Sequence, residues 1–279
     1  MSLRALIPKL LIFALLSCLC DSAVLAEGVE IVWAPRSGEQ PLGGPVFVDF
    51  CVTNHLPRAI EFDLGPGSKM AFELEISTPA GVRHKRKLEI KEGIYMPGLV
   101  VVQPGDRYQQ QLVINDWFEL VEAGTYSARL RLTAPIRDDN GLALEVKKRE
   151  ALIVFTLVED PERLRNICER LVRQATRLEA RIALEAAHAL GYVQHPICTP
   201  LLKECLLTTF HGRDSIARSL ANIGTAEAVD ALIAAWKKDR GKFQYAVGWA
   251  LYDARDKIRD PEVKKRVAAF LKESGVGGT

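Results

Sequence analysis

Cysteine is scarce in this sequence. The chain has six cysteines among 279 residues, and only Cys51, Cys168, Cys198 and Cys205 follow residue 26. Cysteines this sparse do not make the disulfide framework of a small secreted scaffold. Packed cores must therefore hold the fold, and a hydrophobic content of 48% is ample for them. A chain of this length suits two domains of ordinary size.

A strong excess of one charge is also missing. The formal net charge is +2, with −3 on residues 27–158 and +4 on residues 159–279. Neither value demands a nucleic acid or an anionic membrane as a partner. The basic run RHKRK at residues 83–87 has no interleaved aromatic residue. We interpret it as a solvated strand start rather than as an anion-binding hairpin.

The familiar catalytic signatures are absent as well. The sequence contains no G-x-S-x-G, no H-E-x-x-H, no P-loop and no G-x-G-x-x-G. His195, Cys198, Cys205 and His211 lie close together in the sequence, but they do not form the two close ligand pairs of a zinc site. We therefore predict no catalytic residue, no cofactor and no metal ligand.

A few polar residues outside any motif could be mistaken for a site. Asp116 and Glu122 flank Trp117 and Phe118 and form a nominal carboxylate pair, which we interpret as turn caps. His188 lies mid-helix among alanines and is interpreted as a packed histidine. A nucleophile and its base would need serine or cysteine beside histidine in space, which the sequence does not indicate.

The first 26 residues have the pattern of a secretory signal peptide. Arg4 and Lys9 give a positive start, and residues 10–20 form an apolar run that is too short to span a bilayer. Val24 and Ala26 satisfy the small-residue rule, so cleavage is expected after Ala26. The mature protein is therefore expected to be secreted or periplasmic.

Two alternatives to this interpretation stay open. The run LLSC ending at Cys18 has part of a lipobox, so acylation of Cys18 would tether the protein to a membrane. The same segment could instead be a short anchor or a core helix. No later stretch of the sequence is apolar enough to cross a membrane.

Residues 28–158 alternate between apolar and polar side chains, which predicts strands with one buried face. The alternation is clear at residues 46–53, 60–64, 72–76, 112–114 and 126–132. Turn signals such as GGP, GPG and DNG separate these runs. Seven to nine short strands without helices between them predict an antiparallel β-sandwich over residues 27–158.

The run LVEAGTYSA around Tyr126 resembles the tyrosine corner of immunoglobulin-like domains. The resemblance implies that the Tyr126 hydroxyl bonds to the backbone upstream. Ala128 stands where antibody domains have cysteine, and Cys51 shares a strand face with Asp49 and Thr53 rather than the buried face. We therefore expect a sandwich without a disulfide, in which Cys51 is a free thiol.

From residue 159 the period changes to that of helices. Asp160 is a plausible N-cap and Pro161 a first-turn residue. Amphipathic helices are predicted at residues 161–175, 178–191, 196–209, 213–223, 225–238, 242–254 and 260–273.

These helices repeat. The segment ALEAAHALG ends at Gly191, and SIARSLANIG ends 33 residues later at Gly224. The pattern resembles the HEAT repeat, particularly the PBS-lyase HEAT-like form, over residues 178–273. The resemblance implies a short α-solenoid across residues 159–279 with a protein-binding surface, and residues 161–175 as its capping helix. Gly191 and Gly224 are expected to be left-handed C-caps.

The helical cysteines allow one disulfide. Cys198 and Cys205 are seven residues apart on one predicted helix, so their Cα atoms lie about 10 Å apart and cannot be bridged. A bond from Cys168 to either Cys198 or Cys205 across neighbouring helices is geometrically allowed. Three buried free thiols are the alternative.

Two sets of residues are candidates for contact with a partner. Arg170, Arg173 and Arg177 follow a helical stripe, although a solvated, salt-bridged face would give the same pattern. Trp236, Trp249 and Tyr252 concentrate aromatic side chains near the C-terminus, and such residues are favoured interface anchors. Packing in the core of the last repeat would explain them equally well.

The sequence thus favours an exported, non-enzymatic protein-binding or scaffold protein with a protein partner in the extracytoplasmic space. An accessory or inhibitory module of an extracytoplasmic enzyme, such as a protease, is the alternative. A hydrolase with an unrecognised site is the third hypothesis.

Overall fold

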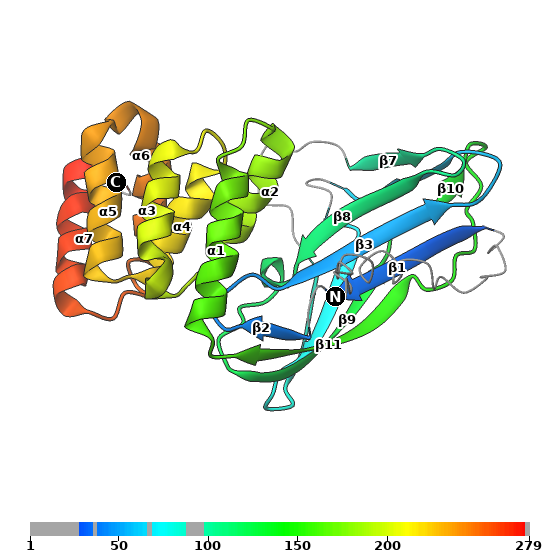
Figure 1. The fold of residues 1–279 in the computed structure, drawn as a ribbon, viewed down its shortest axis with the longest axis horizontal. Coiled ribbons are helices and arrows are strands. Elements are labelled where there is room, and N and C mark those ends of the chain that lie inside the picture. Colours follow the sequence, from blue (N-terminus) through cyan, green and yellow to red (C-terminus); the bar gives the residue numbers. More distant parts are fainter. Residues whose placement is uncertain (1–27, 36–37, 66–68, 88–97, 277–279) are drawn as a thin grey trace, which may run out of the picture.

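The computed structural model describes residues 28–276, except 36–37, 66–68 and 88–97. The predicted signal peptide and Cys18 lie outside the described residues. The strands end at Val158 and the helices begin at Pro161, which confirms the predicted order of a β-rich half and a helical half (Figure 1). Within the described ranges, no helix is both long and apolar enough to cross a membrane.

The described strands of the β-rich half form three sheets. The sheet orders are β1-β3-β8, β10-β4-β7 and β2-β11-β9-β5-β6. The strands are β1 (Val29–Pro35), β2 (Glu39–Pro41), β3 (Phe47–Asn54), β4 (Ile60–Asp63), β5 (Phe72–Ser77), β6 (Arg83–Lys87), β7 (Leu99–Val102), β8 (Arg107–Val113), β9 (Gly124–Leu132), β10 (Arg137–Asp138) and β11 (Glu150–Val158).

One strand pair departs from the predicted antiparallel arrangement. β2 pairs with β11 in parallel, with Thr156 opposite Glu39, whereas the other ladders between named strands are antiparallel. β1 lies in a different sheet from β2, so the chain changes sheets between these two strands. A three-residue strand has too short an alternation to predict this pairing.

The alternating pattern places the core of the β-rich half correctly. β3 buries Val48, Phe50 and Val52, as its alternation predicts. Cys51 points to the other face of β3 and is a free thiol, yet it is buried as well. The Arg107 side chain on the neighbouring strand β8 contacts its Sγ, and long side chains can cover a strand face in this way.

The helical half contains seven α-helices among the described residues. They form two rows, because α2, α4 and α6 contact one another in turn, as do α1, α3, α5 and α7. We call α2, α4 and α6 the even row. The helices are α1 (Pro161–Ala175), α2 (Ala180–Leu190), α3 (Thr199–Thr208), α4 (Arg213–Ile223), α5 (Ala226–Lys238), α6 (Arg240–Ala254) and α7 (Pro261–Ser274), with a 3-10 turn η3 (Pro196–Cys198) before α3.

Of the predicted helix caps, those at Asp160 and Gly224 are correct and the one at Gly191 is wrong. Asp160 caps α1 by accepting a hydrogen bond from the Arg163 N–H, and Gly224 ends α4 with a left-handed φ of 65°. Gly191 ends α2 with a right-handed φ of −59°, so the predicted left-handed cap is wrong there. A Cβ at Gly191 would lie 3.1 Å from Ser215 Cβ of α4. Glycine at this position therefore favours the close approach of α2 and α4.

Candidate functional site

The two halves share a packed junction. Phe47 of β3 and Val113 of β8 belong to the hydrophobic core of the helices. Gly44 lets α1 approach, because a Cβ there would lie 2.8 Å from Leu164 Cδ1. The Gln194 N–H donates to the Gly43 carbonyl at 2.8 Å. Apolar contacts and a backbone hydrogen bond therefore dock the halves together.

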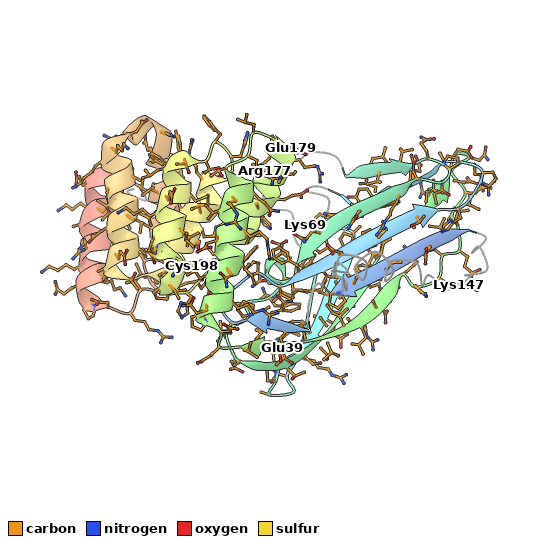
Figure 2. All side chains as sticks on the ribbon, in the orientation of Figure 1. Glu39, Lys69, Lys147, Arg177, Glu179 and Cys198 are labelled. Carbon is orange, nitrogen blue, oxygen red and sulfur yellow. The ribbon has the colours of Figure 1, made fainter. Side chains whose placement is uncertain are left out.

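Asp116 is the centre of the polar part of this junction. It ends the 3-10 turn η2 (Ile114–Asp116) that follows β8, and its side chain is only 7% exposed. Its Oδ1 accepts hydrogen bonds from Tyr192 Oη at 2.5 Å and from His188 Nε2 at 2.7 Å. Lys69 Nζ donates to Oδ2 at 2.5 Å, and Figure 2 labels Lys69 between the helices and the strands. We call Lys69, Asp116, His188 and Tyr192 the junction cluster.

The junction cluster stabilises the charged form of Asp116. Burial alone would raise the pKa of Asp116, but the hydrogen bond from His188 and the charge of Lys69 outweigh it and lower the pKa to about 2. Burial, followed by the negative charge of Asp116, raises the pKa of Tyr192. Asp116 is therefore a carboxylate and Tyr192 a neutral hydrogen-bond donor throughout the physiological range.

The same geometry makes the junction cluster a poor acid–base site. Three donors already occupy Asp116, so the carboxylate is not free to take a proton from a substrate. His188 Nε2 contacts Asp116 and Lys69, and among the described residues no hydrogen bond joins His188 to a serine or a cysteine. The cluster joins residues far apart in the sequence and locks the two halves together.

A cleft of about 400 Å³ lies beside the junction cluster. One wall is the loop of residues 115–120, which follows β8, and the opposite wall comes from the ends of α2 and α4. Arg86 of β6, Arg218 of α4 and Lys257 after α6 line it as exposed cations. We call this cavity the junction cleft.

A smaller pocket of about 190 Å³ lies between α4 and α6. Tyr245 and Trp249 of α6 line it, and they are 75% and 53% exposed. Arg218 lines both this pocket and the junction cleft. We call the cavity the aromatic pocket. It and the junction cleft are neighbouring cavities that share the Arg218 side chain.

Residues 213–235 match the family model of the PBS lyase HEAT-like repeat. The match covers α4 and most of α5. It supports a HEAT-type repeat in the helical half, and such a repeat suggests a helical protein-interaction surface. No protein with curated function matches this chain.

Solved structures show only distant likenesses to this chain. The putative ApaA protein from Bordetella pertussis is 10% identical with a TM-score of 0.30, covering 47% of this chain and 95% of that one. The sporulation control protein Spo0M from Bacillus subtilis is 12% identical with a TM-score of 0.26, covering 53% of this chain and 54% of that one. Scores this low carry no argument about fold or function.

The predicted aromatic residues separate into a buried and an exposed set. Trp249 is exposed beside the HEAT-like repeat and contacts the half-buried Tyr252 edge-on at 5.6 Å. Trp236 is buried and packs edge-on against Phe270 at 5.2 Å between ring centroids. Its position on the inner side of α5 makes Trp236 a core residue, so including it among the contact candidates is wrong.

The predicted arginine stripe is exposed but lies elsewhere. Arg170 and Arg173 are on α1. Arg177, which is labelled in Figure 2, follows the end of this helix. None of the three lines the junction cleft or the aromatic pocket. On α1, Arg165 forms an ion pair with Glu169. Among the described residues, Arg170, Arg173 and Arg177 form no ion pair with a carboxylate.

The cysteines of the helical half are buried free thiols in this structure. Cys168 of α1 and Cys198 of η3 are in hydrogen-bond contact, and this contact together with burial raises the pKa of Cys168. The bridge from Cys168 to Cys198 or Cys205 is not formed here and stays a prediction. In the part of the chain that the structure describes, no cluster of three His, Cys, Asp or Glu residues is suited to a metal ion.

Sequence reasoning missed the junction cluster. It treated Asp116 as a turn cap and His188 as a packed histidine, whereas the two are hydrogen-bonded across the junction. Lys69 and Tyr192 carried no signal, because each is an isolated polar residue near a turn. Only the helical spacing of His188 and Tyr192, four residues apart, places both on one face of the α2 end.

Proposed function

We propose that this protein is an exported, non-enzymatic binding protein that presents the even row of its helices to a protein partner. An immunoglobulin-like sandwich of residues 27–158 supports a HEAT-type array of residues 159–279. The single observation that carries the proposal is the exposed aromatic pair Tyr245 and Trp249 on α6, beside the matched repeat.

Exposed aromatic rings on a helical repeat indicate a role in binding a partner rather than a role in packing the core. A buried Trp or Tyr would contribute hydrophobic free energy to folding, roughly 25 cal/mol per Å² of apolar area. Trp249 and Tyr245 forgo most of this contribution. Trp and Tyr are also the residues most enriched among interface hot spots. Their place beside a pocket gives a partner side chain somewhere to insert.

The β-rich half is best explained as a rigid support. The Tyr126 hydroxyl donates to the Glu122 carbonyl at 2.9 Å, which is the hydrogen bond that a tyrosine corner requires. The Tyr126 ring stacks on Phe155 with centroids 5.4 Å apart. These contacts favour an immunoglobulin-like arrangement, and the junction cluster attaches that support to the helices.

Site-specific crosslinking in the native compartment tests the proposal. A photoreactive phenylalanine replaces Tyr245 in one variant and Phe210 in another. Phe210 is a matched control, because it is 76% exposed in the loop between α3 and α4 but lines neither cavity. The proposal predicts one stoichiometric protein adduct from position 245 that position 210 does not give. No adduct, or the same adducts from both positions, would contradict it.

A further inference from the structure

We infer that the junction cleft is a binding site for an acidic segment of a polypeptide. The inference rests on the proposed function and gives the chemistry of the partner: carboxylate side chains in the junction cleft and an apolar side chain in the aromatic pocket.

Cations from separate elements converge on the junction cleft. Arg86 comes from β6, Arg218 from α4 and Lys257 from the segment after α6. Among the described residues, no ion pair involves any of the three. Three cations that form no ion pair with a described carboxylate line one cavity, and this arrangement favours an anionic ligand.

The carboxylates that line the junction cleft do not cancel these cations. They are Asp116 and Glu119. Asp116 is paired with Lys69 inside the junction cluster, so its charge is already balanced. Glu119 is exposed and is the other carboxylate in the lining. The cleft is left with an excess of positive charge, although the whole chain is close to neutral.

The shape of the surface selects a polypeptide over a small anion. Arg218 joins the junction cleft to the aromatic pocket. A further cavity of about 550 Å³ shares Glu119, Gln194, Asn222 and Lys257 with the cleft and reaches the start of α5. An inorganic anion would occupy one point of this groove. An extended chain with both acidic and apolar side chains would follow its length.

The charge pattern also disfavours a polyphosphate backbone. Asp214 and Asp253 line the aromatic pocket with Arg218 as its one cation. In the further cavity, Arg259 lies in the lining beside Asp260. A nucleic acid carries one negative charge per nucleotide and would meet Asp214 and Asp253 wherever it entered the aromatic pocket. A polypeptide with its acidic residues grouped in one place avoids them.

Peptide titration with the purified full-length protein tests the inference. The probe is acetyl-Phe-Gly-Glu-Glu-Glu-Glu-amide, and the matched peptide carries glutamine in place of each glutamate. We expect the acidic peptide to bind at least tenfold more tightly than the glutamine peptide in isothermal titration calorimetry. We also expect its affinity to fall as salt is added.

Matched variants locate the binding. We expect Arg218→Gln and Lys257→Gln each to lower the affinity for the acidic peptide at least tenfold. Lys265→Gln makes the same charge change at an exposed position on α7, outside the three cavities, and leaves the affinity within twofold. Equal weakening by Lys257→Gln and Lys265→Gln would overturn the inference, because it would show only a general charge effect. Inorganic phosphate that displaces the peptide at similar concentration would also overturn it in favour of a small-anion site.

The two proposals fail separately. If the acidic peptide binds in an Arg218-dependent way but no adduct forms at position 245, the proposed function is contradicted and the acidic-segment site is supported. If an adduct forms at position 245 but the protein binds the acidic and glutamine peptides equally well, the proposed function is supported and the acidic-segment site is contradicted.

Discussion

At the scale of single residues, Asp116 links distant parts of the chain. It receives hydrogen bonds from Lys69 in the β-rich half and from His188 and Tyr192 in the helical half. A buried carboxylate with several donors is stabilised in its charged form. The position of the helices relative to the sheets therefore depends on a charge that burial alone would suppress.

Asp116→Asn should show the contribution of this charge. The folded-state pKa of Asp116 is about 2, against an ordinary value of 3.8. A lowered pKa contributes stability that is complete above the unfolded pKa and disappears as pH falls through the folded one. The variant should therefore lose about 2 kcal/mol of unfolding free energy at pH 7, and the difference should vanish between about pH 4 and pH 2.

Urea unfolding of both proteins from pH 7 down to pH 2 measures this difference. Asp256→Asn is the control, because Asp256 is largely exposed and its pair with Arg255 is solvated. A pH-independent difference between Asp116→Asn and the parent would show that the loss comes from packing and not from the charge.

Residue roles were the least predictable part of this molecule. His188 and Asp116 are 72 residues apart, and neither local sequence predicts the contact between them. Trp249 and Trp236 lie on similar helices, yet one is exposed and the other buried. Local patterns place a residue on a helix, but the packing of neighbouring helices decides which rings reach solvent.

At the scale of elements, prediction succeeded where short-range chemistry decides the outcome. α1 and α4 occupy the residues that their periodicity predicts, since Asp160 caps one and Gly224 ends the other. β3 buries the alternate residues expected of it. The parallel pairing of β2 was missed because it joins strands more than a hundred residues apart.

Gly191→Ala tests the revised role of that glycine. A Cβ there would lie 3.1 Å from Ser215 Cβ and 3.2 Å from the Ser215 carbonyl oxygen, so α4 would have to shift by a few tenths of an ångström away from the end of α2. We expect a loss of about 1–3 kcal/mol in thermal or urea unfolding. Gly241→Ala is the control: a Cβ there meets only Asp239 Oδ1 at 3.7 Å. It should leave stability unchanged or raise it by up to about 1 kcal/mol. Equal effects of the two changes would refute the packing argument.

At the scale of the whole molecule, the two halves form one docked unit. The sequence predicted the β-rich and helical halves but not how they meet, because the junction is built from isolated residues such as Gly44, Phe47 and Asp116. The junction cleft exists only because the halves are held in this arrangement. A partner that binds there would contact both.

The proposed export makes a prediction about the mature chain. Intact mass and N-terminal sequencing of the protein from the extracytoplasmic fraction should give Glu27 as the first residue. Cys18→Ser should leave its release unaltered. A mature chain that starts at an acylated Cys18, and is lost from the membrane in the Cys18→Ser variant, would replace the soluble form with a lipoprotein.

The central claim is that the even row binds a protein through the aromatic pocket. The most direct test is the equilibrium affinity for the protein crosslinked at position 245, measured with the parent, Trp249→Ala and Phe210→Ala. We predict that Trp249→Ala loses at least 2 kcal/mol, about thirtyfold in affinity, as expected of a hot-spot aromatic residue, while Phe210→Ala matches the parent. Indistinguishable affinities for all three proteins would contradict the claim.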